Sequence, residues 1–208
     1  KKICTDNFDA VFNYLKTIAV SSGIISNVSN QDLTKKLIST YPKLVAMNRQ
    51  LLFPIEIKYN SYSSLGLDRI ANSVGAYSIL PNQNNLIIDI GTCITYDFIT
   101  KEKEYVGGSI SLGSQMRFKA LSNFTNALPL VEFNPFVSLI GKSTQTAMQS
   151  GVFHGILSEM NGIIQSYQAE FGQVQTIICG GDAKYFESKI KAHIFVDSNL
   201  VLSGLHTI

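Results

Sequence analysis

Residues 86–99 carry the pattern in this chain that most strongly indicates chemistry. An apolar run ends at Asp89, turns at Gly91 and Thr92, and resumes as a second apolar run. A glycine lets a ligand approach the backbone closely, and backbone N–H groups and the Thr92 hydroxyl can donate to phosphate oxygens. Asp89 can hold a cation or a metal-bound water beside that negative charge. The pattern predicts a phosphate loop made from a β-hairpin; a tight turn with a solvated aspartate is the alternative.

A second candidate site is Gly66-Leu67-Asp68-Arg69, which opens an amphipathic stretch with helical spacing. Asp68 therefore falls in the first turn of the expected helix, where the helix dipole favours a carboxylate. Arg69 can hold a carboxylate-bearing ligand through a bidentate fork. The alternative interpretation is a capping acid followed by a surface arginine.

Two further segments lie at the starts of expected helices. Gly141-Lys142-Ser143-Thr144 precedes a long helical pattern, and either hydroxyl there can be an ordinary helix cap. The buried-strand pattern at 176–179 runs into the diglycine Gly180-Gly181. Such a junction lets a flat ring or a phosphate approach the backbone, although any tight turn between a strand and a helix can use it.

Composition excludes several classes of protein. The chain has 208 residues, is 45% hydrophobic and carries 17 basic against 15 acidic residues. Because the basic residues are scattered, nothing in the sequence indicates a nucleic-acid partner. The apolar stretch at 17–25 is too short and too interrupted to cross a membrane, so we expect a cytoplasmic protein without membrane contact. Cys4, Cys93 and Cys179 lack metal-ligand spacing and are expected to be reduced packing residues.

The hydrophobic periodicity predicts a mixed α/β sheet flanked by helices. Helices are expected at 6–16, 30–39, 68–81, 114–122 and 144–171 and after residue 182, and strands at 18–20, 54–58, 105–110, 176–179 and 194–196 besides the hairpin. A tail is expected from residue 200. The polar segment 81–85 is the clearest linker, so we expect a domain boundary there, between 1–80 and 81–208.

The order of these motifs resembles that of the type III pantothenate kinases, within the superfamily of actin, hexokinase and the heat-shock chaperone ATPases. The resemblance also runs through Tyr59, Gly107-Gly108, Leu112-Gly113, Leu128-Pro129, Gly151 and Leu202-Ser203-Gly204-Leu205. It implies two ribonuclease-H-like (actin-like ATPase) subdomains with mixed sheets flanked by helices. Family members open with a phosphate loop, Asp-x-Gly-Asn-Thr, followed by a lysine. This sequence lacks that loop, so we expect an N-terminally truncated chain, the first subdomain being incomplete at its N-terminus, or else a short variant.

The resemblance implies transfer of the γ-phosphoryl group of ATP to pantothenate, giving 4'-phosphopantothenate in the first step of coenzyme A biosynthesis. It makes Asp68 the catalytic base. It implies pantothenate contacts from Tyr59, Gly66, Leu67, Asp68, Arg69 and Thr144, ATP contacts from Gly91, Thr92, Gly180 and Gly181, and a monovalent cation, K⁺ or NH₄⁺, at Asp89. Mg²⁺ accompanies the nucleotide, and a homodimer is implied in which Thr144 reaches the pocket of the neighbouring subunit.

Two other functions stay open at this point. One is a catalytically silent accessory or regulatory relative, which the missing loop favours and the presence of Asp68, Asp89, Thr92 and Thr144 opposes. The other is a kinase of the same superfamily that acts on another small hydroxyl substrate. Tyr59 together with residues 66–69 favours pantothenate, through the resemblance alone.

Overall fold

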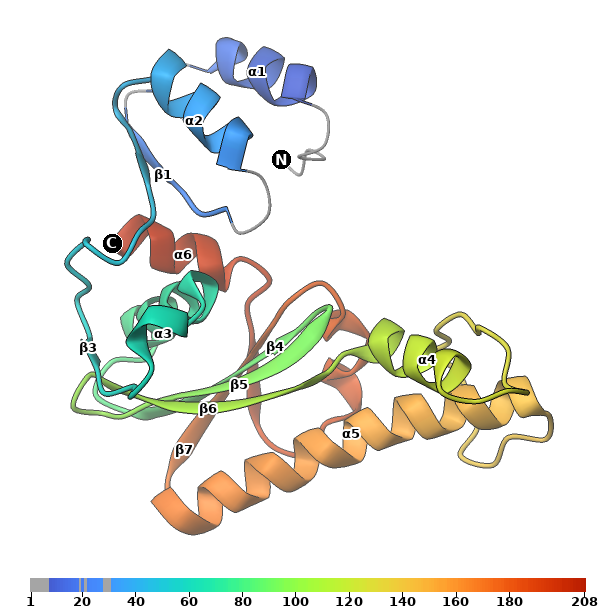
Figure 1. Ribbon diagram of the computed structural model, residues 1–208. Coiled ribbons are helices and arrows are strands. Elements are labelled where there is room, and N and C mark those ends of the chain that lie inside the picture. The colour runs from blue at the N-terminus through green and yellow to red at the C-terminus, as the bar shows by residue number, and fades with distance from the viewer. Residues whose placement is uncertain (1–7, 19, 21, 28–30) are drawn as a thin grey trace.

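The computed structural model describes residues 8–18, 20, 22–27 and 31–208. The described chain forms a small N-terminal unit above a larger body that contains a six-stranded sheet (Figure 1). This mixed α/β sheet with flanking helices confirms the expected fold class. Within the described ranges, no helix combines the length and the apolarity needed to cross a membrane.

The large sheet has the strand order β3-β6-β5-β4-β7-β8. Its strands are β3 (Glu56–Ile57), β4 (Asn84–Ile90), β5 (Cys93–Ile99), β6 (Glu104–Leu112), β7 (Val174–Cys179) and β8 (Ile194–Val196). β4, β5 and β6 form an antiparallel meander, whereas β7 pairs in parallel with β4 and β8. The register places Asp89 between Thr95 and Cys179, so this carboxylate lies where the parallel strands β4 and β7 both end.

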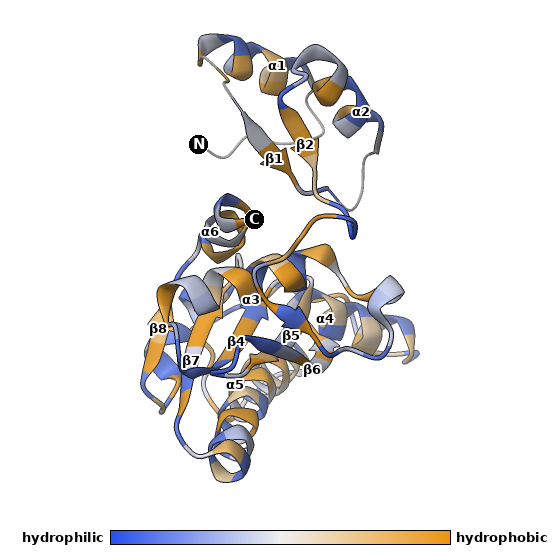
Figure 2. Ribbon diagram, turned by 90° about the vertical axis from the view of Figure 1, so that its left-hand side faces the viewer, coloured by the Kyte–Doolittle hydropathy of each residue, from blue (hydrophilic) through white to orange (hydrophobic). Residues whose placement is uncertain are grey.

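Helices cover both faces of the sheet (Figures 1 and 2). α3 (Leu67–Ile79) and α6 (Leu200–Thr207) share one apolar cluster with Ile87, whereas α5 (Thr144–Phe171) shares the other with Leu86 and Ile88. Successive side chains of a strand point to opposite faces, so a central strand between two helix layers must be apolar throughout. α4 (Ser114–Asn123) follows β6 and packs along α5.

α3 and α6 approach each other backbone to backbone. A Cβ atom at Gly204 would lie 1.8 Å from the carbonyl oxygen of Ala71, and one at Gly75 would lie 2.5 Å from that of Leu200. Only glycine fits at these two positions. α6 was not predicted, because residues 200–208 were expected to form a tail. Since α3 carries Asp68 and Arg69, this contact helps to set their position.

The N-terminal unit has its own small core. It consists of α1 (Phe8–Thr17), β1 (Gly23–Ile25), α2 (Gln31–Thr40) and β2 (Leu44–Ala46), with β1 and β2 parallel. Leu33, Leu37 and Leu44 are its buried apolar residues. The segment that leaves the unit is tied to the larger body by Arg49, whose Nε and Nη2 donate to the carbonyl oxygens of Tyr62 and Leu65 at 3.1 and 2.7 Å.

Most predicted elements are confirmed within a few residues, and besides the tail at 200–208 two expectations are corrected. The first strand is β1 at 23–25 rather than the expected strand at 18–20, of which residue 19 lies outside the described residues. The strand β2 was not predicted. Two 3₁₀ turns, Ala183–Tyr185 and Glu187–Lys189, replace the helix expected after Asp182. The Asp182 N–H donates to the carbonyl oxygen of Ile90 at 3.0 Å, which ties the start of this segment to the end of β4. The boundary at 81–85 stays a prediction; these residues join α3 to β4.

Candidate active site

The turn of the β4–β5 hairpin lies against the start of α4. Gly91 N–H donates to the carbonyl oxygen of Cys93 at 2.9 Å, and Gly113 N–H donates to that of Thr92 at 3.1 Å. A Cβ atom on Gly113 would lie 2.2 Å from the carbonyl oxygen of Gly91, so the close approach requires glycine. The hairpin predicted at 86–99 is therefore confirmed, and Thr92 lies exposed at its tip.

The diglycine after β7 lies beside the same hairpin. Gly180 has a φ of +93°, and a Cβ atom there would lie 2.4 Å from Asp89 Oδ1. Gly180 and Gly181 line a cavity of ≈ 400 Å³ together with Lys184, Glu187, Val196 and Ser198 among others. Asp182 Oδ2 accepts a hydrogen bond of 3.2 Å from the Ser114 hydroxyl. The hairpin turn, the diglycine and the start of α4 thus meet at one end of the sheet.

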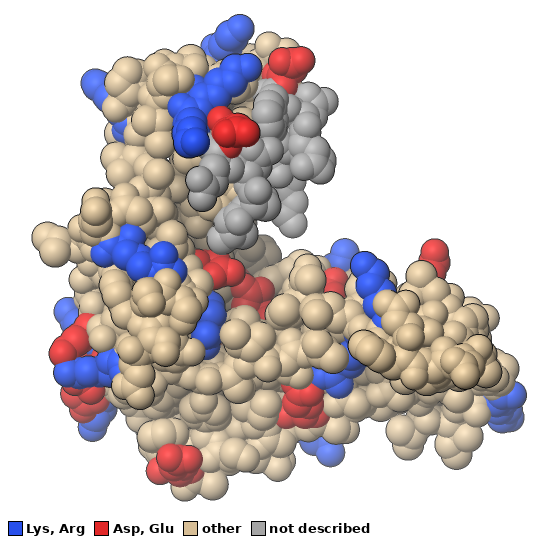
Figure 3. All heavy atoms as spheres, in the orientation of Figure 1, with Lys and Arg blue, Asp and Glu red and all other residues tan. Residues whose placement is uncertain are grey.

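The N-terminal end of α3 brings Asp68 towards Asp89. Asp68 lies in the first turn of α3, as predicted, and is exposed there. Its Oδ1 accepts a hydrogen bond of 2.9 Å from Arg69 N–H. One turn further on, Asn72 Nδ2 donates to Asp89 Oδ2 at 2.8 Å. The sequence interpretation missed Asn72, although its i+4 spacing from Asp68 places both on one helix face. Figure 3 shows acidic side chains clustered between the surface over α3 and that over α4.

Asp89 carries a charge that its surroundings disfavour. Burial raises the pKa of Asp89, the charge of Asp68 raises it further, and hydrogen bonds from Asn72 and Cys179 oppose the shift. Asn72 Oδ1 is buried and has no hydrogen-bond partner among the described residues. A cation would stabilise the charge of Asp89 and give Asn72 Oδ1 a partner, because carboxylate and amide oxygens are ligands that hard cations prefer. In the described chain no three His, Cys, Asp or Glu residues gather as a metal cluster, so a cation here would need other oxygen ligands as well.

Arg69 is not the surface arginine of the alternative interpretation. Its side chain is buried, Nε donates to Asp97 Oδ1 at 2.8 Å, and Nη2 lies 2.7 Å from the same oxygen. The Tyr59 ring centroid lies 5.8 Å from Arg69 Cζ, and a Cβ atom on Gly107 would be 3.4 Å from that ring. The structure thus brings Tyr59 and Arg69 together beside the start of α3. Asp97 was not predicted, although a carboxylate within the apolar run 94–99 could have signalled it.

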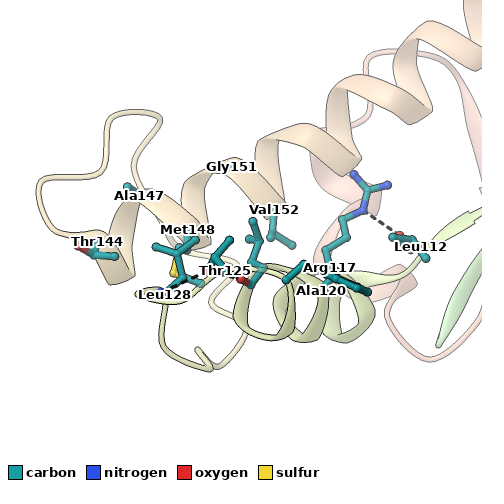
Figure 4. Close-up of a pocket in the computed structure, with 12 residues that line it drawn as sticks. Leu112, Arg117, Ala120, Thr125, Leu128, Thr144, Ala147, Met148, Gly151 and Val152 are labelled. Atoms are coloured by element: carbon teal, nitrogen blue, oxygen red, sulfur yellow. Dashed lines mark hydrogen bonds between the residues drawn. The ribbon is translucent and has the colours of Figure 1, made fainter.

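Thr144 lies apart from the other predicted residues. Ser143 is the N-cap of α5 and forms a capping box with Thr146, so Thr144 is the first residue of the helix and is exposed. It lines a largely apolar cavity of ≈ 840 Å³ between α4 and α5, together with Leu128, Met148 and others (Figure 4). In Figure 1 this end of α5 projects away from α3. Within one chain, Thr144 does not join the group around Asp68.

A sequence profile described as type III pantothenate kinase matches residues 5–166. The chain belongs to the type III pantothenate kinase family. It is 43% identical to the type III pantothenate kinase of Cytophaga hutchinsonii over 88% of this chain and 78% of that protein. It is 40% identical to that of Christiangramia forsetii over 100% of this chain and 85% of that protein.

A comparison of structures adds support for the fold alone. The chain superimposes on a Campylobacter jejuni protein described as a Baf family transcriptional activator with a TM-score of 0.60 at 22% identity. The match covers 94% of this chain and 85% of that one. It therefore includes both the N-terminal unit and the larger body of this type III pantothenate kinase family member.

Proposed function

We propose that this chain transfers the γ-phosphoryl group of ATP to the primary hydroxyl of pantothenate, the first step of coenzyme A biosynthesis. Membership of the type III pantothenate kinase family supports the reaction. The observation that carries it to this molecule is the exposed carboxylate of Asp68, held at the N-terminal end of α3 beside Asp89 and the two glycine turns. Phosphoryl transfer needs mainly positioning and charge neutralisation, which such a site can supply.

Asp68 is the base in this proposal. Its carboxylate orients the pantothenate hydroxyl and accepts the proton as the oxygen attacks the γ-phosphorus. Arg69 N–H donates to Oδ1, which leaves Oδ2 of the exposed carboxylate for the substrate. Its place in the first turn of α3 is one where the helix dipole favours a carboxylate.

ATP is proposed to lie along the hairpin turn and the diglycine. The Gly91 N–H already donates to Cys93 within the turn, so the exposed hydroxyl of Thr92 at its tip is the donor that we assign to the phosphate oxygens. The cavity of ≈ 400 Å³ at Gly180 and Gly181 is open enough for the nucleoside end. Because Gly180 touches Asp89, the two ends of the nucleotide would flank that carboxylate.

Asp89 is proposed to bind a monovalent cation, K⁺ or NH₄⁺, with Mg²⁺ accompanying the nucleotide. The partly buried carboxylate of Asp89, with its raised pKa, and the unpartnered Oδ1 of Asn72 fit such an ion. When bound, the cations would neutralise the charge of the phosphates and of the carboxylates around them. A cytoplasmic location stays a prediction.

Pantothenate is proposed to bind at the start of α3. Gly66 and Leu67 lead into the helix, and the buried Arg69 and the partly buried Tyr59 lie immediately behind it. The guanidinium of Arg69 supplies N–H donors for the pantothenate carboxylate. Tyr59 covers one side of this group with an aromatic ring.

A homodimer is proposed because Thr144 lies apart from Asp68 in one chain. The loop between α4 and α5 exposes apolar side chains, of which Phe124 and Phe136 are 88% and 90% exposed. Exposed apolar clusters of this kind mark interaction surfaces. A second copy that covers this loop would bury it and could bring its own Thr144 to the pantothenate of the first.

The base is tested with Asp68→Asn and the matched control Asp32→Asn, an exposed aspartate in the first turn of α2. Pantothenate-dependent ADP release is measured on the complete protein in potassium buffer. We expect Asp68→Asn to lower kcat by about 10²-fold or more, because a general base contributes that much, and Asp32→Asn to leave it unchanged. Near-normal turnover of Asp68→Asn would remove it from this role. Nucleotide binding without any turnover by the wild type would favour the accessory function.

The dimer is tested by sedimentation with Phe136→Glu and the control Leu52→Glu, since the two side chains are 90% and 94% exposed. We expect only Phe136→Glu to give a monomer. Mixing Asp68→Asn with Thr144→Arg then asks whether one site uses both subunits. Random exchange would restore roughly a quarter of the wild-type activity if it does, because half of the dimers would carry one intact site of two. No recovery after proven exchange would refute a shared site.

A further inference from the structure

A buried carboxylate behind the proposed pantothenate site has no role in the reaction so far. Asp97 lies in β5, is 0% exposed, and accepts the 2.8 Å hydrogen bond from Arg69 Nε across 28 positions of sequence. Arg69 itself is 6% exposed. An ion pair withdrawn from water in this way gains little net stability compared with apolar packing, so its presence calls for another reason.

Two strands hold Asp97 in place. The Tyr105 hydroxyl, from β6, donates to Asp97 Oδ1 at 2.7 Å, and the Thr95 hydroxyl, from β5, donates to Oδ2 at 3.1 Å. Tyr105 is also fully buried. Both carboxylate oxygens therefore have donors, and neither Asp97 nor Tyr105 has room to turn elsewhere. The carboxylate is a fixed point to which Arg69 is attached.

Arg69 keeps donor capacity after this attachment. A guanidinium has five N–H donors, and only its Nε hydrogen bond to Asp97 is aligned. Nη2 lies 2.7 Å from the same oxygen, as in an ion pair, yet it has no aligned hydrogen-bond acceptor among the described residues. A buried donor without an acceptor is costly, so it marks a place where a ligand oxygen would be stabilised.

The neighbouring ring completes the arrangement. Tyr59 lies with its ring centroid 5.8 Å from Arg69 Cζ and 6.1 Å from the ring centroid of Tyr105. The guanidinium is thus held at its Nε edge by a carboxylate and flanked by an aromatic ring. The N–H groups that do not bond to Asp97 can form the fork that binds a carboxylate.

We propose that Asp97 and Tyr105 are positioning residues that hold Arg69 ready to bind the carboxylate of the acceptor substrate. The inference rests on the proposed function, in which Arg69 contacts pantothenate. A preorganised guanidinium binds a carboxylate without first losing the rotamer freedom of a long side chain. Asp97 also neutralises the charge of Arg69 before substrate arrives, which makes burial of the arginine tolerable.

The test compares two ligands that differ at the carboxylate. Pantothenate is measured by kcat/KM, and pantothenyl alcohol, in which a hydroxymethyl group replaces the carboxylate, by its competition constant against pantothenate. We expect Tyr105→Phe and Asp97→Asn to lower kcat/KM for pantothenate about tenfold, mainly through KM, because a hydrogen bond to a charged group is weakened. The competition constant of the alcohol should change by less than about twofold.

Tyr96→Phe is the matched control, because Tyr96 is also a fully buried tyrosine whose hydroxyl donates to a carboxylate, Glu159, at 2.8 Å. It should affect the two ligands equally. An equal effect of Tyr105→Phe on pantothenate and on the alcohol would overturn the positioning role. If Asp97→Asn fails to fold, the result for Tyr105→Phe alone tests the inference.

Arg69→Lys separates this inference from the proposed function. If Arg69→Lys weakens binding of pantothenate more than binding of the alcohol, while Tyr105→Phe affects both ligands equally, the inference is overturned and the proposed function stands. An unselective Arg69→Lys would overturn the contact between Arg69 and the substrate carboxylate, and the inference with it. Selectivity in Arg69→Lys and Tyr105→Phe, absent from Tyr96→Phe, is the result that supports both.

Discussion

The contact between α3 and α6 makes a prediction in which one chemical change has opposite effects at two sites. Gly204 lies inside α6 and Gly162 inside α5, and each is changed to alanine. A Cβ atom at Gly204 would lie 1.8 Å from the carbonyl oxygen of Ala71, whereas one at Gly162 meets nothing within 4 Å. The same added methyl group is therefore forced against backbone at one site and has open space at the other.

The magnitudes follow from two opposing effects. Alanine is favoured over glycine inside a helix by about 1 kcal/mol, which applies to both variants. Overpacking costs about 1–3 kcal/mol or more, which applies only at Gly204, where α3 and α6 must separate by roughly 1 Å. We expect Gly162→Ala to stabilise the protein by about 0.5–1 kcal/mol. At Gly204 the contact is with backbone, so the upper end of the overpacking cost applies, and we expect Gly204→Ala to destabilise the protein by about 2 kcal/mol.

Urea unfolding, followed by far-UV circular dichroism, measures both free energies. Equal m values for the three proteins would show that the change lies in stability rather than in the compactness of either state. Since α3 carries Asp68, the kcat of Gly204→Ala should fall under conditions where the protein is fully folded. A Gly204→Ala variant as stable as Gly162→Ala would refute the close helix contact.

Three further predictions concern partly buried charges and backbone conformation. Burial would raise the pKa of Glu159, but hydrogen bonds from Arg117 and others outweigh that effect and lower the pKa. The stabilisation by Glu159 is therefore fully present above the ordinary value of 4.5 and is lost as the pH falls through the lowered pKa. In urea unfolding, Glu159→Gln should destabilise the protein by about 1–3 kcal/mol at pH 7, and this difference should shrink as the pH falls below 4.5. Burial raises the pKa of Asp89, so ionisation of this carboxylate lowers the stability of the folded protein as the pH rises above 3.8. Asp89→Asn should therefore increase the melting temperature at pH 8 and have no such effect at pH 3. The same variant should abolish turnover. Gly180→Ala should cost about 2 kcal/mol or more in urea, because of its positive φ and its contact with Asp89, whereas Gly181→Ala should stay within about 0.5 kcal/mol.

Local patterns in the sequence were enough for the parts of the site that a short segment forms by itself. The turn at Gly91 and Thr92 was predicted from two apolar runs around a glycine, and the start of α3 from helical spacing after Gly66. Ser143 was recognised as a potential cap, and the structure shows that it is one. These features depend on hydrogen bonds and side-chain periodicity within a few residues, which the sequence displays directly.

The sequence was less informative where one element depends on another. Residues 200–207 are helical because α6 packs its glycine against α3, and the segment after Asp182 is not a regular helix because it is tied to Ile90. Neither contact leaves a signal in the local pattern. Propensity is a weak guide when tertiary contacts decide the outcome.

By itself, the sequence determined the order of the motifs, the place of Asp68 in a first helical turn, the hairpin that carries Asp89, and the family to which the chain belongs. Only the tertiary structure decided that Asn72 donates to Asp89 and that Arg69 is held by Asp97. Those partners are 17 and 28 positions apart, on a helix and a strand. Which donor meets which acceptor at such distances depends on how the helix packs on the sheet, and that packing is a property of the whole core.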